Sequence, residues 1–368
     1  GFDAKRFFHN NTGLGNYSRD LIRILAQYFP ENHYVLYNPK QKSNYSSLVQ
    51  NSSLLEKNPK GFWKSFKSLW RLFGQKNQIR KDKLDIFHGL SGEIPIRLPK
   101  NVKSVVTIHD LIFMRYPKLY SFFDRKIHFL KFRYAAKKAD CVIAISEQTK
   151  QDIIRYLKIN PKKIKVVYQG CSDVFKQTFS SEETESVRKK LNLPDNFVLN
   201  VGTIEERKNA LTIVKAIRNL DIKLVLVGRK TKYYQQIENY VQQNDLQHKI
   251  IHLKGISQEE LAIVYQLSTV MVYPSVFEGF GIPIIEALFS KAPVITTNSG
   301  VFPEAGGTDS LYINPSDDKE LQQKIAYLLN NPEKRKEISE KGFAYAQKFT
   351  DENIAKQLDL IYKNVLKA

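Results

Sequence analysis

The chain has 368 residues, of which 42% are hydrophobic and 17 are glycine, so it suits two folded domains and excludes an intrinsically disordered protein. Its formal net charge of +20 indicates a polyanionic or membrane-surface partner. The two cysteines, Cys141 and Cys171, lack metal-ligand spacing, which indicates a reducing compartment, and no run approaches the roughly 18 apolar residues of a transmembrane helix.

Strand-like apolar runs alternate with helical patterns along the chain. The opening sequence GFDAK resembles the end of a first strand, so we expect a few residues to precede Gly1. Further strands are predicted at residues 33–39, 85–90, 102–111, 141–146, 164–170, 197–203, 222–229, 250–255, 269–275, 292–298 and 311–315. Helices are predicted at residues 16–29, 123–139, 147–158, 181–193, 208–220, 233–245, 258–268 and 353–368.

This alternation predicts an α/β fold with two doubly wound parallel sheets. A polar segment at residues 171–185 separates the two halves and predicts the linker. We therefore expect an N-terminal Rossmann-like domain over residues 1–175 and a C-terminal one over residues 176–349.

A glycine-rich turn, Thr12-Gly13-Leu14-Gly15, comes directly before the first predicted helix. A turn of this kind between a strand and a helix is a potential cradle for a phosphate or a sugar, and Gly13 and Gly15 are the candidate contacts. A tight turn that merely needs glycine explains the same residues equally well.

His109 comes directly after the apolar run VVTI, near the end of the predicted strand at residues 102–111, and Ser146 comes directly after CVIAI, at the end of the next strand. Ligands bind beyond the carboxyl ends of strands in doubly wound sheets, so His109 is a candidate site residue. The alternative is a histidine with all its hydrogen bonds made within the fold. Ser146 is equally well explained as the N-cap of the helix that follows.

The stretch at residues 57–83 combines lysines with aromatic residues, and its spacing predicts one basic amphipathic helix. The apolar face carries Phe62, Phe66, Leu69 and Phe73, with Trp63 and Trp70 at its edge and Lys64, Lys67 and Arg71 opposite. Two interpretations remain open: an anchor in an anionic membrane interface, or a helix whose aromatic face packs on the sheet. The basic helix at residues 125–138 is the second candidate for such an anchor.

Two adjacent cations, Arg207 and Lys208, follow the strand at residues 197–203 within the sequence GTIEERKN, which begins at Gly202. Arginine offers a bidentate fork and lysine a point charge, so the pair suits a diphosphate. A solvated charge pair is the alternative.

The most informative stretch is YPSVFEGFGIPIIEALFSK, at residues 273–291. We expect a strand that ends at Pro274, a loop, and a helix that opens near Phe280 or Gly281. Glycine permits close approach of a ligand, and the amides from Gly279 to Ile282 lie at a helix N-terminus, where a phosphate is stabilised. Carboxylates repel a phosphate, so Glu278 and Glu286 are candidate acceptors for sugar hydroxyls.

The string EGFGIPIIE, at residues 278–286, resembles the signature of the family 4 glycosyltransferases, which are retaining enzymes of the GT-B architecture. GTIEERKN resembles the diphosphate-binding loop of that family, although many relatives carry arginine where this chain has Thr203. The resemblance implies two Rossmann-like domains that face a cleft, with the helix at residues 350–368 crossing back to the first domain. It covers nearly the whole chain.

The resemblance also assigns roles to individual residues. The implied catalytic residues are Glu278, His109, Arg207 and Lys208. The implied donor-binding residues are Gly13, Gly15, Gly202, Arg207, Lys208, Gly279, Phe280, Gly281, Ile282 and Glu286. No D-x-D pair occurs in the sequence, so we expect neither a metal nor a cofactor, and the cations and the helix dipole would replace the metal.

The expected reaction is transfer of a hexose from a nucleoside diphosphate sugar to a hydroxyl of a glycan or a lipid-linked acceptor in bacterial cell-surface polysaccharide synthesis. GDP-mannose is favoured as the donor, and a UDP-sugar is next. A GT-B sugar-nucleotide epimerase and a non-catalytic basic binding protein remain alternatives, whereas an oxidoreductase would need a G-x-G-x-x-G string after a strand. No nucleic-acid motif is visible, so we expect no nucleic-acid partner. We expect a cytoplasmic protein whose candidate partner surface is the inner face of the plasma membrane.

Overall fold

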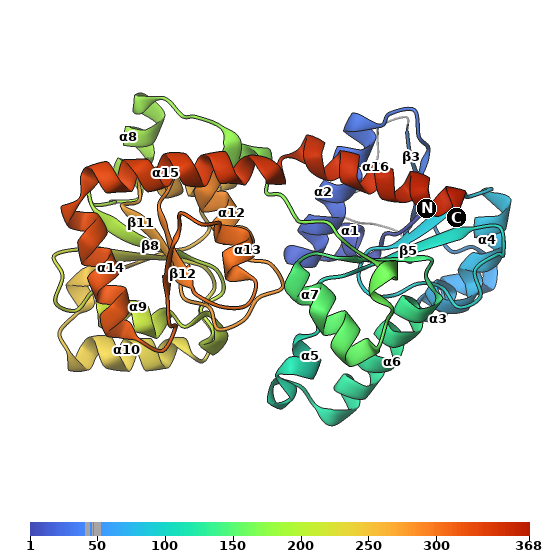
Figure 1. The fold of residues 1–368 in the computed structure, drawn as a ribbon, viewed down its shortest axis with the longest axis horizontal. Coiled ribbons are helices and arrows are strands. Elements are labelled where there is room, and N and C mark those ends of the chain that lie inside the picture. The colour runs from blue at the N-terminus through green and yellow to red at the C-terminus, as the bar shows by residue number, and fades with distance from the viewer. Residues whose placement is uncertain (41–44, 46, 48–52) are drawn as a thin grey trace. The chain divides into compact units, whose positions relative to one another are not determined.

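A computed structural model of the chain describes residues 1–40, 45, 47 and 53–368, and it consists of two compact units. The first unit comprises Gly1–Gln169 together with Asp351–Ala368, and the second comprises Gly170–Thr350 (Figure 1). The boundary therefore lies a few residues before the predicted end of the first domain at residue 175. The last helix packs on the first unit, mainly against the helix that follows the Thr12-Gly13-Leu14-Gly15 turn.

The first unit contains a seven-stranded parallel sheet in the order β3-β2-β1-β4-β5-β6-β7. Its strands are β1 (Phe2–Asp3), β2 (Tyr34–Tyr37), β3 (Leu54–Lys57), β4 (Ile86–Gly89), β5 (Lys103–Ile108), β6 (Cys141–Ala144) and β7 (Ile164–Val166). Its α-helices are α1 (Lys5–His9), α2 (Gly13–Tyr28), α3 (Lys67–Leu69), α4 (Gln75–Lys81), α5 (Ile112–Arg115), α6 (Phe122–Lys138), α7 (Glu147–Asp152) and α16 (Asp351–Lys367). Short 3₁₀ or π turns are η2 (Gly61–Lys64), η3 (Trp70–Gly74), η4 (Pro117–Leu119), η5 (Ile153–Leu157) and η6 (Pro161–Lys163).

Helices cover both faces of this sheet, as expected for a doubly wound unit. On one face, apolar side chains of α2 and α16, such as Leu25 and Leu358, form a buried cluster with strand residues. On the other face, Ala136 of α6 and Leu157 of η5 pack against Val142 and its neighbours. Alternate residues of β5 and β6 therefore enter different cores.

The second unit contains a six-stranded parallel sheet in the order β10-β9-β8-β11-β12-β13. Its strands are β8 (Phe197–Val201), β9 (Lys223–Val227), β10 (Ile250–Leu253), β11 (Val270–Tyr273), β12 (Val294–Thr297) and β13 (Leu311–Ile313). Its α-helices are α8 (Ser181–Lys190), α9 (Ala210–Ala216), α10 (Tyr234–Gln243), α11 (Gln258–Leu267), α12 (Ile282–Phe289), α13 (Phe302–Gly306), α14 (Asp318–Asn330) and α15 (Pro332–Ala346). Its 3₁₀ turns are η7 (Asp173–Lys176), η8 (Glu206–Lys208), η9 (Gln247–Lys249) and η10 (Gln347–Phe349).

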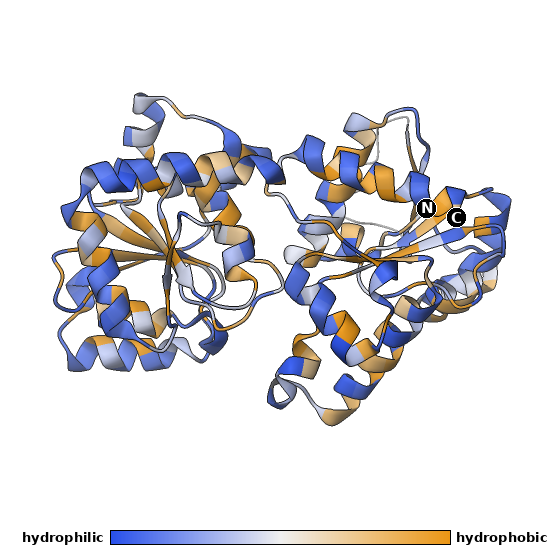
Figure 2. Ribbon diagram, viewed as in Figure 1, coloured by the Kyte–Doolittle hydropathy of each residue, from blue (hydrophilic) through white to orange (hydrophobic). Residues whose placement is uncertain are grey.

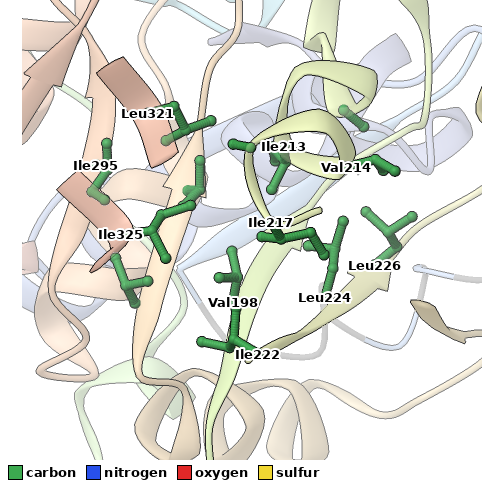
Figure 3. Packing of buried hydrophobic residues seen from close by; sticks show 14 of the residues in the cluster. Val198, Ile213, Val214, Ile217, Ile222, Leu224, Leu226, Ile295, Leu321 and Ile325 are labelled. Carbon is green, nitrogen blue, oxygen red and sulfur yellow. The ribbon is translucent and has the colours of Figure 1, made fainter. Parts of the chain in front are cut away.

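The predicted α/β fold with two Rossmann-like parallel sheets is confirmed. In the second unit, α9, α10 and α14 lie on one side of the sheet, and α12 and α15 lie on the other (Figure 1). Figure 3 shows the core on the α9 side, where Ile213 of α9 and Ile217, the residue that caps its C-terminus, meet Val198 of β8 and Leu224 of β9. The strands are predominantly hydrophobic, whereas α14 and α15 carry many hydrophilic residues (Figure 2).

Both strand orders reverse direction at one point, between β1 and β4 in the first unit and between β8 and β11 in the second. Such a switch point opens a crevice at the carboxyl ends of the two strands, because the crossover connections leave it in opposite directions. The loops that follow β8 and β11 therefore meet at the place in the second unit where a doubly wound sheet binds ligands.

The prediction of one continuous helix over residues 57–83 is wrong. The end of β3 occupies its start, η2 is a separate 3₁₀ turn, and α3, η3 and α4 then follow one another without a break as a helical run over residues 67–81. Trp70 is only 3% exposed and packs near Tyr37 of the sheet, and a Cβ at Gly74 would lie 2.6 Å from Trp70 and 2.8 Å from Trp63. The predicted spacing placed Trp70 at the edge of the apolar face. In the structure the backbone winds unevenly here, because residues Trp70–Gly74 form a π-helical segment within the run, and Trp70 is turned into the core.

None of the helices in the described ranges has the length and apolar content that a membrane span requires.

Candidate active site

The loop after β8 owes its shape to two glycines with left-handed backbone angles. Gly202 has φ of +136° and Gly228, after the neighbouring strand β9, has φ of +151°. A Cβ at Gly228 would lie 1.9 Å from the carbonyl oxygen of Gly202, so only glycine fits there. Asn209, also left-handed with φ of 57°, then turns the chain into α9. The cations Arg207 and Lys208 lie between these fixed points.

Glu278, in the loop after β11, is held by four side chains. Its Oε1 accepts hydrogen bonds from Nζ of Lys208 at 2.5 Å, from the hydroxyl of Ser275 at 2.8 Å and from the hydroxyl of Tyr273 at 3.0 Å. Its Oε2 lies 2.8 Å from a guanidinium nitrogen of Arg207. At the switch point, the carboxylate of Glu278 thus connects the motif at residues 278–286 with the motif that contains Arg207 and Lys208.

Arg207 is itself held in place on both sides. Its guanidinium donates to the backbone carbonyl of Phe277 and, at 2.7 Å, to a carboxylate oxygen of Glu205. The backbone carbonyl of Arg207 accepts from the amide of Val276 at 2.9 Å. Backbone and side chain together tie the β8 loop to the β11 loop.

Charge balance decides the protonation state of this cluster. Burial alone would raise the pKa of Glu278, but the nearby Lys208 and Arg207 outweigh it and hold that pKa below its ordinary value. Burial lowers the pKa of Lys208, and Glu278 opposes that shift. The Glu278 side chain is 12% exposed and that of Lys208 is 13% exposed, so Glu278 is an ionised carboxylate in a largely dehydrated ion pair.

Glu286 has the opposite environment. It lies within α12, and its Oε2 accepts a hydrogen bond at 2.9 Å from the hydroxyl of the buried Tyr265 in α11. Burial raises the pKa of Glu286 to about 7, although the Tyr265 bond works against the rise. The pKa values of two carboxylates eight positions apart in the sequence are thus shifted in opposite directions, which is the pattern of groups with different tasks.

The start of α12 presents a helix N-terminus to the same loop. Gly281 precedes it with φ of +104°, and Pro283 occupies its first turn, where a missing amide hydrogen costs nothing. The amides of Gly281 and Ile282 donate no hydrogen bond to any of the described residues. Phe280 is buried and packs near Phe349, so it anchors the loop.

Two family profiles match the chain, one to each half. The profile described as "Glycosyltransferase Family 4" matches residues 12–173, and that described as "Glycosyl transferases group 1" matches residues 181–345. The chain belongs to the family 4 glycosyltransferases.

Relatives of this glycosyltransferase include two mannosyltransferases. The O-antigen chain mannosyltransferase RfbU of Salmonella typhimurium is 29% identical over 239 residues, and the match spans 64% of this chain and 64% of RfbU, which is less than two thirds of either. The O-antigen chain mannosyltransferase B of Escherichia coli is 26% identical over 373 residues, with 96% of both chains covered. The crystal structure of Anabaena Alr3699/HepE in complex with UDP has a TM-score of 0.77 at 16% identity, covers 99% of this chain and 98% of its own, and agrees with the predicted GT-B fold.

His109 of the glycosyltransferase lies in the first unit, after β5, and both of its ring nitrogens are engaged there. A carbonyl only accepts, so Nε2 donates to the carbonyl of Leu90 at 2.9 Å, and Nδ1 accepts from the side-chain amide of Gln169 at 3.1 Å. Burial lowers the pKa of His109 to about 4, with Arg6 contributing. His109 is therefore neutral, and its ring stands edge-on to Tyr17 with centroids 4.5 Å apart.

The two glycines of the first turn differ in their surroundings. A Cβ at Gly15 would lie 1.8 Å from the carbonyl oxygen of Asn10, whereas one at Gly13 would meet nothing within 4 Å. The amides of Thr12 and Gly15 both donate to the side chain of Asn10, at 2.9 and 3.0 Å. This geometry accounts for Gly15 as a tight-turn residue and leaves Gly13 at an open helix start.

The loops that follow β8 and β11 in the second unit thus carry Gly202, Arg207, Lys208, Glu278, Gly279, Phe280 and Gly281, and α12 then carries Ile282 at its start and Glu286 one turn later. His109, Gly13 and Gly15 belong to the first unit. Sequence reasoning missed the roles of Tyr273, Ser275 and Tyr265. The first two stand inside the signature stretch, but no spacing rule marks Tyr265, which reaches Glu286 from another helix.

Among the described residues, no group of three or more histidine, cysteine, aspartate or glutamate side chains is arranged to hold a metal ion.

Proposed function

We propose that this glycosyltransferase moves a hexose, with mannose from GDP-mannose favoured and a UDP-sugar next, to a hydroxyl of a glycan or lipid-linked acceptor in cell-surface polysaccharide synthesis. The two O-antigen mannosyltransferases support mannose and the pathway, and the UDP complex of Alr3699/HepE supports a nucleoside diphosphate as part of the donor.

The observation that carries the proposal is the ionised Glu278 bound to Arg207 and Lys208 at the switch point of the second sheet. A diphosphate that leaves a sugar gains negative charge, and fixed cations in a dehydrated site stabilise that charge with little reorganisation. The α12 N-terminus adds backbone amides, those of Gly281 and Ile282, that suit phosphate oxygens. In this proposal Glu278 holds Arg207 and Lys208 in place and accepts hydrogen bonds from hydroxyls of the donor sugar.

The proposed reaction retains the configuration of the sugar. The bond between the anomeric carbon and the diphosphate oxygen breaks, and its electron pair leaves with the diphosphate. The acceptor oxygen forms a bond to the same carbon on the same face, and its proton passes to the departing diphosphate oxygen. This course needs no covalent bond to the protein, so positioning of donor and acceptor is the main requirement.

Glu286 is proposed to accept hydrogen bonds from the ribose hydroxyls of the donor. Its raised pKa favours this role only above neutral pH, where the carboxylate is ionised and accepts with both oxygens. Nucleotide affinity should therefore increase as the pH rises through about 7.

The test has two stages. GDP, UDP, GDP-mannose and UDP-glucose are first compared for the rise in melting temperature that each causes, because a ligand of the folded state stabilises it. Donors that bind are then incubated with free and lipid-linked glycans, and NMR reports the anomeric configuration of the product. Lys208→Met should abolish turnover, whereas Lys232→Met, an exposed lysine of the same unit, should not change it.

Three outcomes would contradict the proposal. If no nucleoside diphosphate changes the melting temperature, the proposal that the donor is a nucleoside diphosphate sugar is wrong. If the product has the inverted anomeric configuration, the proposal of a retaining reaction is wrong. Conversion of the donor to another sugar nucleotide without any acceptor would favour an epimerase.

A further inference from the structure

Exposed apolar side chains concentrate on two segments of the first unit, residues 60–76 and residues 117–138. Of the fifteen large hydrophobic side chains that are exposed in the described chain, nine lie in these two segments. They are Phe62, Phe66, Leu69, Phe73, Tyr120, Phe122, Phe123, Ile127 and Leu130. Scattered exposed hydrophobics need no explanation, but a concentration of this kind marks an interaction surface.

The apolar residues of α6 form a stripe on its outward side. Phe123, Ile127 and Leu130, at helical positions i, i+4 and i+7, are 76%, 52% and 59% exposed. The residues of α6 that are buried in the core of the unit, Ala135 and Ala136, lie near the end of the helix. The stripe is therefore not part of the buried core of its own unit.

The second segment carries a matching stripe. Phe62 and Phe66 lie with ring centroids 4.7 Å apart and are 70% and 44% exposed, and Leu69 and Phe73 continue the row. Trp70 points the other way into the core. The uneven winding of residues 57–83 thus separates a buried tryptophan from an exposed row of apolar side chains.

One carboxylate joins the two segments. Glu93 accepts from Arg71 of η3 at 3.0 Å and from Lys131 of α6 at 3.3 Å. Next to it, a Cβ at Gly92 would lie 2.5 Å from the ring of Phe132, so α6 packs directly on this loop. The two segments consequently adjoin at the loop that carries Gly92 and Glu93, and together we call them the aromatic–basic face (residues 60–76 and 117–138).

The charge of this face is almost entirely positive. Its sequence contains twelve lysines and arginines and a single acidic residue, Asp124, which accepts from Ser121. The exposed lysines are Lys60, Lys64, Lys67, Lys118, Lys126, Lys131, Lys137 and Lys138. A surface that combines exposed aliphatic and aromatic residues with lysines is complementary to anionic headgroups above an apolar layer.

We propose that the aromatic–basic face docks the enzyme on a bilayer that contains anionic lipid. Aliphatic residues such as Ile127, Leu130 and Leu69 favour a lipid surface over nucleic acid, since phosphate and base contacts have no use for them. The proposal deepens the proposed function, because a lipid-linked acceptor would lie in the same surface. Its test measures binding alone and needs no transferase activity.

The experiment measures sedimentation with vesicles of phosphatidylcholine alone and with about one third phosphatidylglycerol. The wild type should bind only the anionic vesicles, and binding should fall at least about tenfold between roughly 0.1 M and 1 M salt, because the screening length shrinks. Trp63, which is half-buried in this face, should shift its fluorescence to the blue on binding, and Trp63→Phe should lose the shift.

Three variants divide the face. Phe123→Ser with Ile127→Ser and Leu130→Ser removes the α6 stripe, Phe62→Ser with Phe66→Ser removes the second stripe, and Lys126→Glu with Lys137→Glu reverses charge. Each should lower vesicle binding at least about tenfold without lowering the melting temperature, because the changed side chains are exposed.

The matched control is Leu360→Ser with Leu366→Ser on α16, where the two side chains are 59% and 48% exposed but lie outside the face. This control should bind vesicles like the wild type.

Equal binding to neutral and anionic vesicles, or wild-type binding by all three variants, would overturn the proposal. A wild type that ignores vesicles but dimerises or binds RNA through the same residues would assign the face to a second copy or to nucleic acid instead. A GDP-induced rise in melting temperature is measured in parallel. If GDP causes no such rise, the proposed donor is contradicted, but the vesicle-binding result is unaffected.

Discussion

Replacing Glu286 by glutamine tests the electrostatics of the site in a single measurement. Glutamine keeps the size of the side chain and a carbonyl oxygen for the hydroxyl of Tyr265, but it cannot ionise. The variant therefore mimics the protonated form of Glu286 at every pH.

The sign and size of the effect follow from the pKa of Glu286, which burial raises from 4.5 to about 7. Between these values the folded protein holds a proton that the unfolded chain has released, so stability falls as the pH rises. The stabilisation is complete below pH 4.5 and is lost as the pH passes through about 7. A shift of this size corresponds to about 3 kcal/mol, taken as an upper bound.

The stability of Glu286→Gln minus that of the wild type should therefore increase by up to about 3 kcal/mol between pH 4.5 and pH 8. Other titrating groups cancel in this difference. The two tryptophans, Trp63 and Trp70, lie in the first unit, so their fluorescence reports only that unit and serves as an internal control.

Unfolding of the second unit is followed in urea by pulsed hydrogen exchange of peptides from β11 and α12, with every pulse at one common pH. A stability difference that does not change with pH would show that Glu286 titrates normally, and the argument from its burial would be wrong. A change in the tryptophan transition would show that the substitution acts beyond its own unit.

Other substitutions test the rest of the site. Glu278→Gln should lower the transfer rate by about a hundredfold or more, as measured with saturating donor, and near-normal turnover would remove Glu278 from the mechanism. Lys208→Ala should lower the free energy of unfolding of the second unit by about 3 kcal/mol, because it leaves the buried Glu278 with one cation fewer, and a change below about 0.5 kcal/mol in urea unfolding would contradict the buried ion pair. Gly228→Ala should destabilise the second unit by more than about 2 kcal/mol, since its Cβ would overlap the carbonyl of Gly202. Gly255→Ala, which has φ of +64° and open space around it, is the matched control and should cost only about 1 kcal/mol, so equal losses would show that backbone strain alone matters.

The sequence by itself determined the fold class and the two motifs of the second unit. Alternating apolar runs and helical patterns are local signals, and each strand of a parallel sheet is apolar on both faces wherever it pairs. Local chemistry also marked Glu278 and the pair Arg207 and Lys208, because a glycine-flanked carboxylate and adjacent cations after a strand have few structural uses. The structure shows these three side chains bonded to one another.

Only the tertiary structure decided which loops meet. The order of strands places β8 next to β11, although β9 and β10 lie between them in the sequence, and this creates the switch point. The bond from Tyr265 to Glu286 depends on how α11 packs beside α12. Periodicity describes one element at a time, so it carries no information about a partner on another element.

The tertiary structure also decided which apolar faces are covered. Spacing in residues 57–83 correctly grouped Phe62, Phe66, Leu69 and Phe73, but it could not show that Trp70 would turn into the core together with Ile79. The burial of a side chain depends on what the rest of the chain places over it, whereas periodicity reports only which side chains share a face. For this reason the exposure of the aromatic–basic face could be established only from the folded unit.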